Sequence, residues 1–150
     1  MRAPLASRSR VRTHQTGVTL IEVLVTVLVL SIGLIGLASL QGNSLKANHS
    51  AYMRAQATIL AHEMFDVMRI DRENARAQEY DGDYSAPPAA TGQLPQDELN
   101  RWITNLQNTL PAPEAEIQTT PATGVVRISV TWDDTRGQEP PQVFTLRTRL

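Results

Sequence analysis

The sequence predicts an α+β fold, in which a long N-terminal helix with a transmembrane first half carries a small head of one short helix and an antiparallel β-sheet. Three observations predict it. Residues 18–40 form an apolar run long enough to span a bilayer, residues 41–78 carry an apolar stripe at helical spacing, and the C-terminal part alternates apolar and polar residues as strands do. The chain is therefore expected to combine a membrane segment with an exported domain.

The run at 18–40 contains one ionisable side chain, that of Glu22. As a helix this run would be about 34 Å long, against a hydrocarbon core of about 30 Å. A charge at the centre of such a helix costs roughly 2.5–3.5 kcal/mol, so Glu22 needs a reason to be there. It is either a carboxylate near the interface that reaches water, or a residue that pairs with a charge on another chain.

The leader before this run, residues 1–17, contains four arginines and no acidic residue. Because positive residues stay on the cytoplasmic side, the N-terminus is predicted to be cytoplasmic and the head periplasmic. Ala38-Ser39 is a weak match to a secretory cleavage site, but the apolar run is longer than the core of a signal peptide. The better candidate for cleavage is Gly17-Val18.

This arrangement resembles the class III signal of type IV prepilins, a basic leader that ends in Gly and is followed by a mature chain with Glu at its fifth position. Gly17, Val18 and Glu22 match these positions, with T-L-I before the Glu. The later run S-I-G-L-I-G-L-A-S-L-Q is similar to that of the minor pilins called type IV pilus modification protein PilV. One departure is Val18, where the family most often has Phe.

The resemblance implies a pilin-like fold and a processing pathway. A prepilin peptidase of the inner membrane would cleave after Gly17 and methylate the new amine of Val18. The mature chain would stay in the membrane until it joins other minor pilins and the major pilin in a fibre. Glu22 would then be an assembly residue, because a buried carboxylate and a buried amine on neighbouring chains compensate each other and set the axial register.

Two glycines, Gly33 and Gly36, interrupt the Val- and Leu-rich helix. A glycine inside a helix costs roughly 1 kcal/mol relative to alanine, so both need a use. Close packing of helices is the simpler interpretation, since small residues let two backbones approach in a membrane. Local unwinding during fibre assembly is the alternative.

The segment 41–78 is predicted to continue the same helix, because no proline occurs between Val18 and Gln78. Its apolar stripe is expected to pack in the core of the head. The stripe consists of Met53, Ala57, Leu60, Met64, Val67 and Met68.

No catalytic or metal site is expected. His62 begins a run similar to the zinc-protease helix motif, but Asp66 stands where the second His is required. Asp81 and Asp83 resemble the start of a calcium loop, but Gly92 occupies the position of the bidentate Glu. The sequence indicates no cofactor and no small-molecule substrate.

The head domain is predicted at residues 79–150. Residues 79–96 are expected to form a loop because they are rich in Pro, Gly and acidic residues. An amphipathic helix is predicted at 97–110, where Pro111 follows it. Strands are predicted at 114–119, 125–133 and 143–149, and the last two should pair as an antiparallel hairpin.

The exported part is acidic. Subtracting the leader's four arginines from a total of 14 basic residues leaves 10, against 15 acidic ones. This balance argues against general nucleic-acid binding, and the lack of cysteine excludes a disulfide. Arg127, Arg147 and Arg149 fall on polar strand positions and form either a solvated face or a patch that binds a partner.

Together these patterns predict a minor pilin, not an enzyme, that moves from the inner membrane to a type IV pilus at the cell surface. Its expected role is to initiate or promote pilus assembly in a tip complex, and so to serve twitching motility and adhesion. One alternative is a minor pseudopilin of a type II secretion system. The other is an uncleaved single-pass membrane protein whose head is a sensor or hydrolase.

Overall fold

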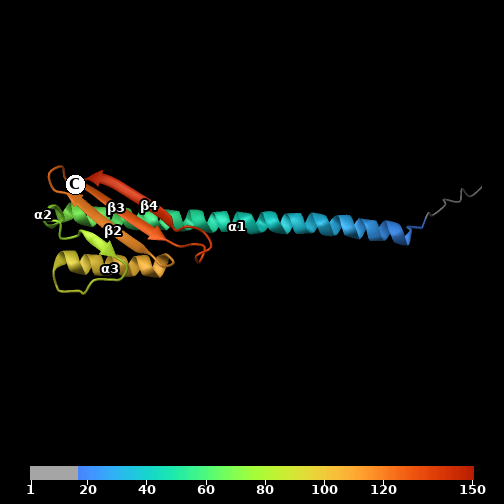
Figure 1. Cartoon of the computed structure of the whole chain (residues 1–150), viewed down its shortest axis with the longest axis horizontal. Coiled ribbons are helices and arrows are strands. Elements are labelled where there is room, and N and C mark those ends of the chain that lie inside the picture. Colours follow the sequence, from blue (N-terminus) through green and yellow to red (C-terminus); the bar gives the residue numbers. More distant parts are fainter. Residues whose placement is uncertain (1–16) are drawn as a thin grey trace, which may run out of the picture. The chain divides into compact units, whose positions relative to one another are not determined.

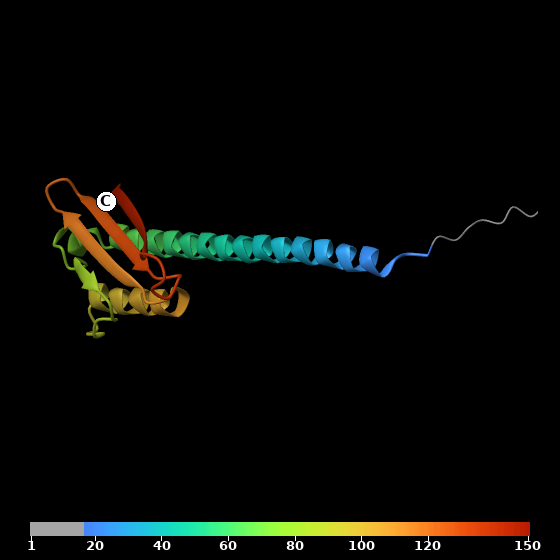
Figure 2. The same cartoon turned by 45° about the vertical axis from the view of Figure 1, so that its right-hand side comes forward.

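The computed structural model describes residues 17–150, and it confirms the α+β prediction. Contacts divide the chain into two units at Asn43 and Ser44. Residues 17–43 and the head unit, residues 44–150, are therefore described separately. The helix α1 (Leu20–Ile70) contributes its first part to the former and its second part to the head unit (Figures 1 and 2).

Helix α1 ends at Ile70, so the prediction that it continues to Gln78 was wrong. Asp71 leaves the helical conformation, with φ −98° and ψ 52°, and a separate short helix α2 (Arg72–Arg76) follows. The Asp71 carboxylate accepts hydrogen bonds from Asn74 Nδ2 at 3.0 Å and from the Tyr80 hydroxyl at 2.7 Å. These contacts stabilise a turn at a place where the sequence contains neither proline nor glycine.

The sheet has four strands in the order β1-β2-β3-β4, and every neighbouring pair is antiparallel (Figure 1). β2 (Glu114–Thr120), β3 (Val125–Trp132) and β4 (Gln142–Arg149) confirm the three predicted strands and the hairpin. β1 (Gly82–Tyr84) was missed, because it lies in the segment predicted to be a loop. Three residues that include a glycine carry too little alternation to indicate a strand.

Helix α3 (Leu94–Thr109) begins before the predicted start at Asp97. Pro95 lies in its first turn, where the missing N–H of proline has no intrahelical partner to lose. The Asp97 carboxylate accepts the backbone N–H groups of Thr91 and Gly92, each at 3.1 Å, and so ties the preceding loop to the helix.

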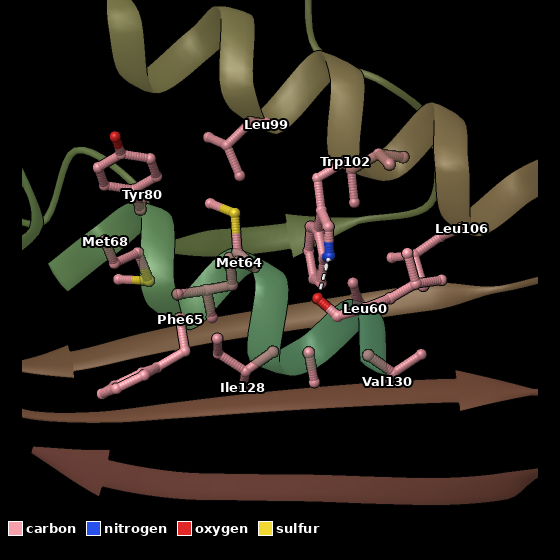
Figure 3. Packing of buried hydrophobic residues seen from close by; sticks show 14 of the residues in the cluster. Leu60, Met64, Phe65, Met68, Tyr80, Leu99, Trp102, Leu106, Ile128 and Val130 are labelled. Carbon is pink, nitrogen blue, oxygen red and sulfur yellow. Dashed lines mark hydrogen bonds between the residues drawn. The ribbon is translucent and has the colours of Figure 1, made fainter. Parts of the chain in front are cut away.

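The core of the head unit has three layers, in which the second part of α1 lies between α3 and the sheet (Figure 3). Met64 and Met68 are fully buried, which confirms that the methionine-containing stripe is core. Trp102 Nε1 donates a 2.8 Å hydrogen bond to the Leu60 backbone carbonyl and so joins α3 to α1 (Figure 3). Ile117, Ile128 and Val130 cover α1 from the sheet side.

Candidate processing and assembly segment

The predicted cleavage site lies just before α1. Gly17 and Val18 are irregular and exposed, and, its chain neighbours aside, no atom of residues 17–150 lies within 4 Å of the place that a Cβ on Gly17 would occupy. A peptidase must bind the chain on both sides of the bond that it cleaves. Within residues 17–150, the surroundings of the Gly17-Val18 bond leave this access open.

Thr19 caps the N-terminus of α1. Its backbone carbonyl accepts the N–H of Val23 at 3.2 Å, and its Oγ1 accepts the N–H of Glu22 at 3.4 Å. Thr19 and Glu22 therefore stand at the first and last positions of the capping-box pattern, which is T-L-I-E in this chain. We did not predict this cap from the sequence, although the pattern that indicates it was present.

Glu22 thus lies in the first turn of a helix, where the macrodipole favours a negative charge. This position gives the carboxylate a stabilising role within its own chain. The Thr26 hydroxyl donates to the Glu22 backbone carbonyl at 2.6 Å, and the Ser31 hydroxyl donates to the Val27 carbonyl at 2.7 Å. Both hydroxyl groups are thereby satisfied inside the helix and do not require water.

The first part of α1 exposes its apolar side chains on all sides. Leu20 and Leu40 are 91% and 66% exposed, and the large apolar residues between them are exposed as well. Within residues 17–150, α1 is the one helix long and apolar enough to cross a membrane. A surface of this kind needs lipid or other apolar helices around it.

Gly33 and Gly36 lie in the same exposed stretch. The helix is continuous through both residues, and a Cβ added at either one would have no neighbouring atom within 4 Å. The two glycines therefore leave a part of the helix surface without side chains. The packing role and the unwinding role stay predictions, because each concerns contacts with other chains.

The other residues that the sequence singled out lie on the head unit. His62 and Asp66 are exposed on α1, and Asp66 lies 3.9 Å from Arg69. Asp81 accepts the backbone N–H of Thr119 at 2.8 Å, which gives it a structural role beside β2. Arg127 and Arg147 lie directly opposite each other on β3 and β4.

Comparison with known proteins finds one family. Residues 12–38 match the family described as "Prokaryotic N-terminal methylation motif". No curated protein and no solved structure gives a significant match to the chain. The chain thus carries a type IV pilin-like signal on a pilin-like α+β fold, which supports a pilin-like or pseudopilin-like protein processed at its N-terminus.

Proposed function

We propose that this protein is a minor pilin of a type IV pilus. The observation that carries the proposal is the N-terminal methylation motif at residues 12–38, which includes the first part of an exposed apolar helix with one carboxylate in its first turn. In this proposal the leader, residues 1–17, is removed by prepilin peptidase. The new N-terminal residue Val18 is methylated, and the chain remains in the inner membrane with its head in the periplasm.

The chemistry of assembly follows from the spacing of two charges. Cleavage after Gly17 creates an amine on Val18, and Glu22 lies one helical turn further along the mature chain. At low dielectric each charge requires a partner, and a staggered neighbour can supply the opposite charge. We propose that Glu22 pairs with the amine of an adjoining subunit, and that Gly33 and Gly36 let neighbouring helices approach closely.

The role of the protein would be interaction and not catalysis. In our proposal the exported part, residues 18–150, enters the fibre with other minor pilins and the major pilin and helps to start assembly at the tip. The resemblance of its first helix to type IV pilus modification protein PilV supports this role. Its acidic balance supports protein partners over nucleic acid.

The processing step can be tested by intact mass and N-terminal sequencing of the full chain extracted from membranes, after expression with and without prepilin peptidase. We expect the enzyme to remove residues 1–17 and to leave one added methyl group on Val18. Gly17→Asp should block the shift. Gly42→Asp is the matched control, because it makes the same change at another exposed glycine with open space around it. A chain that keeps its leader in the presence of the peptidase contradicts the proposal.

The role in the pilus requires a second experiment. Deletion of the gene should reduce surface pili and twitching motility, and the wild-type chain should restore both. A deletion that leaves pili intact but abolishes protein secretion would instead assign the chain to a type II secretion pseudopilus.

A further inference from the structure

The two lateral edges of the sheet carry opposite charges on the same face. On the face turned away from α1, Asp83 of β1 lies directly opposite Glu116 of β2. On the same face, Arg127 of β3 lies directly opposite Arg147 of β4. Like charges directly opposite each other on neighbouring strands are destabilising, so this arrangement costs stability twice within one head.

The basic pair has little compensation inside its own chain. Among residues 17–150, no carboxylate lies within 4.0 Å of either guanidinium, and Arg127 donates instead to the neutral Gln118 side chain at 2.8 Å. Asp83, Arg127 and Arg147 are exposed, and Glu116 is half-buried. Both pairs are therefore accessible to another molecule.

Two shallow hollows accompany the charged pairs. A hollow of about 350 Å³ is lined by residues that include the acidic Asp83, Glu114 and Glu116. A hollow of about 340 Å³ is lined by residues that include Gln118, Arg127 and Arg147. The hollow beside Asp83 has room for an arginine side chain. The hollow beside Arg127 offers N–H groups that can donate hydrogen bonds to a carboxylate.

The edge strand β4 is also open to pairing. It forms eight residues in uninterrupted one-to-one register with β3, without proline, glycine or a bulge, and no strand of residues 17–150 lies on its other side. Val143 in this strand is 56% exposed. Proteins usually protect a long edge strand, because its free N–H and C=O groups can pair with another chain.

Strand direction decides which partner strand fits. Because the four strands alternate in direction, β1 and β4 run opposite ways. A second head in the same orientation, placed with its β1 beside β4, would therefore continue the sheet with antiparallel pairing. The same placement brings the acidic pair of one head to the basic pair of the other.

We propose that β4 of this protein binds the β1 edge of a second copy, with Arg147 of one chain opposite Asp83 of the next. The contact is heterologous, so it can repeat from copy to copy without closing. This inference rests on the membrane anchoring in the proposed function, because copies of the chain held in one membrane carry their heads on the same side of it. The leader and the first helix do not indicate which surface of the head binds another molecule. The proposed contact names that surface and its partner.

The register makes a specific cross-link prediction. With residue 83 opposite residue 147 in antiparallel strands, residue 85, the first residue after β1, comes opposite residue 145 when the chain stays extended. The chain has no cysteine, so Ser85→Cys and Thr145→Cys can be introduced into separate copies without other thiols. Opposed Cβ atoms on paired strands are close enough for a disulfide to form.

In the experiment, full-length Ser85→Cys and Thr145→Cys chains with different tags are expressed together with prepilin peptidase. Membranes are then isolated and treated with an oxidant, so that neighbouring cysteines form a disulfide. We expect a disulfide-linked dimer that contains both tags, and about tenfold less of it when Arg147→Glu is added to the Thr145→Cys chain. Asp83→Arg in the Ser85→Cys chain should restore the dimer to the Arg147→Glu variant. Arg136→Glu is the matched control, because Arg136 is exposed and lies outside both pairs.

The other outcomes overturn the inference. A dimer of Thr145→Cys with itself would show that two β4 edges pair, and a cross-link to a different protein would show another occupant. Absence of the mixed dimer in chains that have lost residues 1–17 would refute the edge contact while the processing proposal stands. Retention of the leader in the same samples would refute the proposed function instead.

Discussion

The Tyr80 hydroxyl donates a 2.7 Å hydrogen bond to the Asp71 carboxylate and so joins the residue that ends α1 to the segment that leads into β1. Tyr80 is fully buried, and its backbone carbonyl accepts a 3.0 Å hydrogen bond from the Tyr84 hydroxyl. Burial and the adjacent Asp71 carboxylate raise the pKa of Tyr80. This corner holds the end of the helix and the first edge of the sheet together.

Tyr80→Phe should destabilise the head by about 1.5–3 kcal/mol, because a hydrogen bond to a charged group is lost. The measurement is urea unfolding of the full chain in detergent, followed by circular dichroism. Tyr52→Phe is the control, since Tyr52 is 57% exposed on α1. Equal midpoints for the two variants would contradict a structural role for the corner.

Alkaline pH should destabilise the head through two tyrosines. Burial raises the pKa of Tyr80 and, with Asp81 and Asp83 nearby, that of Tyr84. Unfolded tyrosine ionises near pH 10. Above that pH the folded state holds more protons than the unfolded state, so the free energy of unfolding falls as pH rises, by up to about 1.4 kcal/mol per pH unit for each tyrosine.

The stabilising effect of the neutral tyrosines is fully present below about pH 10 and is lost as pH rises toward their folded pKa values. Unfolding measured at several pH values from neutral to strongly alkaline tests this, with tyrosinate absorbance as a direct signal of ionisation. The Tyr80→Phe/Tyr84→Phe variant should show a shallower decline. An unchanged slope in that variant would assign the alkaline loss to other groups.

Two substitutions separate the helix cap from the charge at Glu22. Glu22→Gln keeps a side chain that fits the capping box with Thr19 but removes the charge, whereas Glu22→Ala removes both. If the carboxylate pairs with a neighbouring amine, both variants should be cleaved after Gly17 and both should fail to restore pili to a deletion strain. Normal piliation with Glu22→Gln would show that capping is the function of this residue.

Gly33→Ala/Gly36→Ala should leave the isolated chain folded and its helix more stable by roughly 1 kcal/mol per site, because both positions have open space around them. The number of pili should fall if neighbouring helices pack into the space that the two glycines leave without side chains. Counting pili on complemented cells measures this, and Gly42→Ala in the same helix is the control. Undiminished piliation would argue against both the packing and the unwinding interpretations.

Most elements of the fold were predicted from hydrophobic periodicity. The alternation in 125–133 and 143–149 predicted the β3–β4 hairpin, and the stripe that includes Met64 and Met68 predicted the buried face of α1. These patterns depend on residues close together in the chain, so they can be recognised without the tertiary structure. β1 and the end of α1 at Ile70 were not predicted, because they depend on contacts that Asp71 and Tyr80 make after folding.

The candidate cleavage and assembly residues, Gly17, Val18 and Glu22, were identifiable from the sequence, because a basic leader, a glycine and a lone acid in an apolar run are read along the chain. The pairing of Asp83 with Glu116, and of Arg127 with Arg147, was decided by the tertiary structure alone. The physical reason is strand register, because a shift by one residue would turn each of these charges to the opposite face of the sheet.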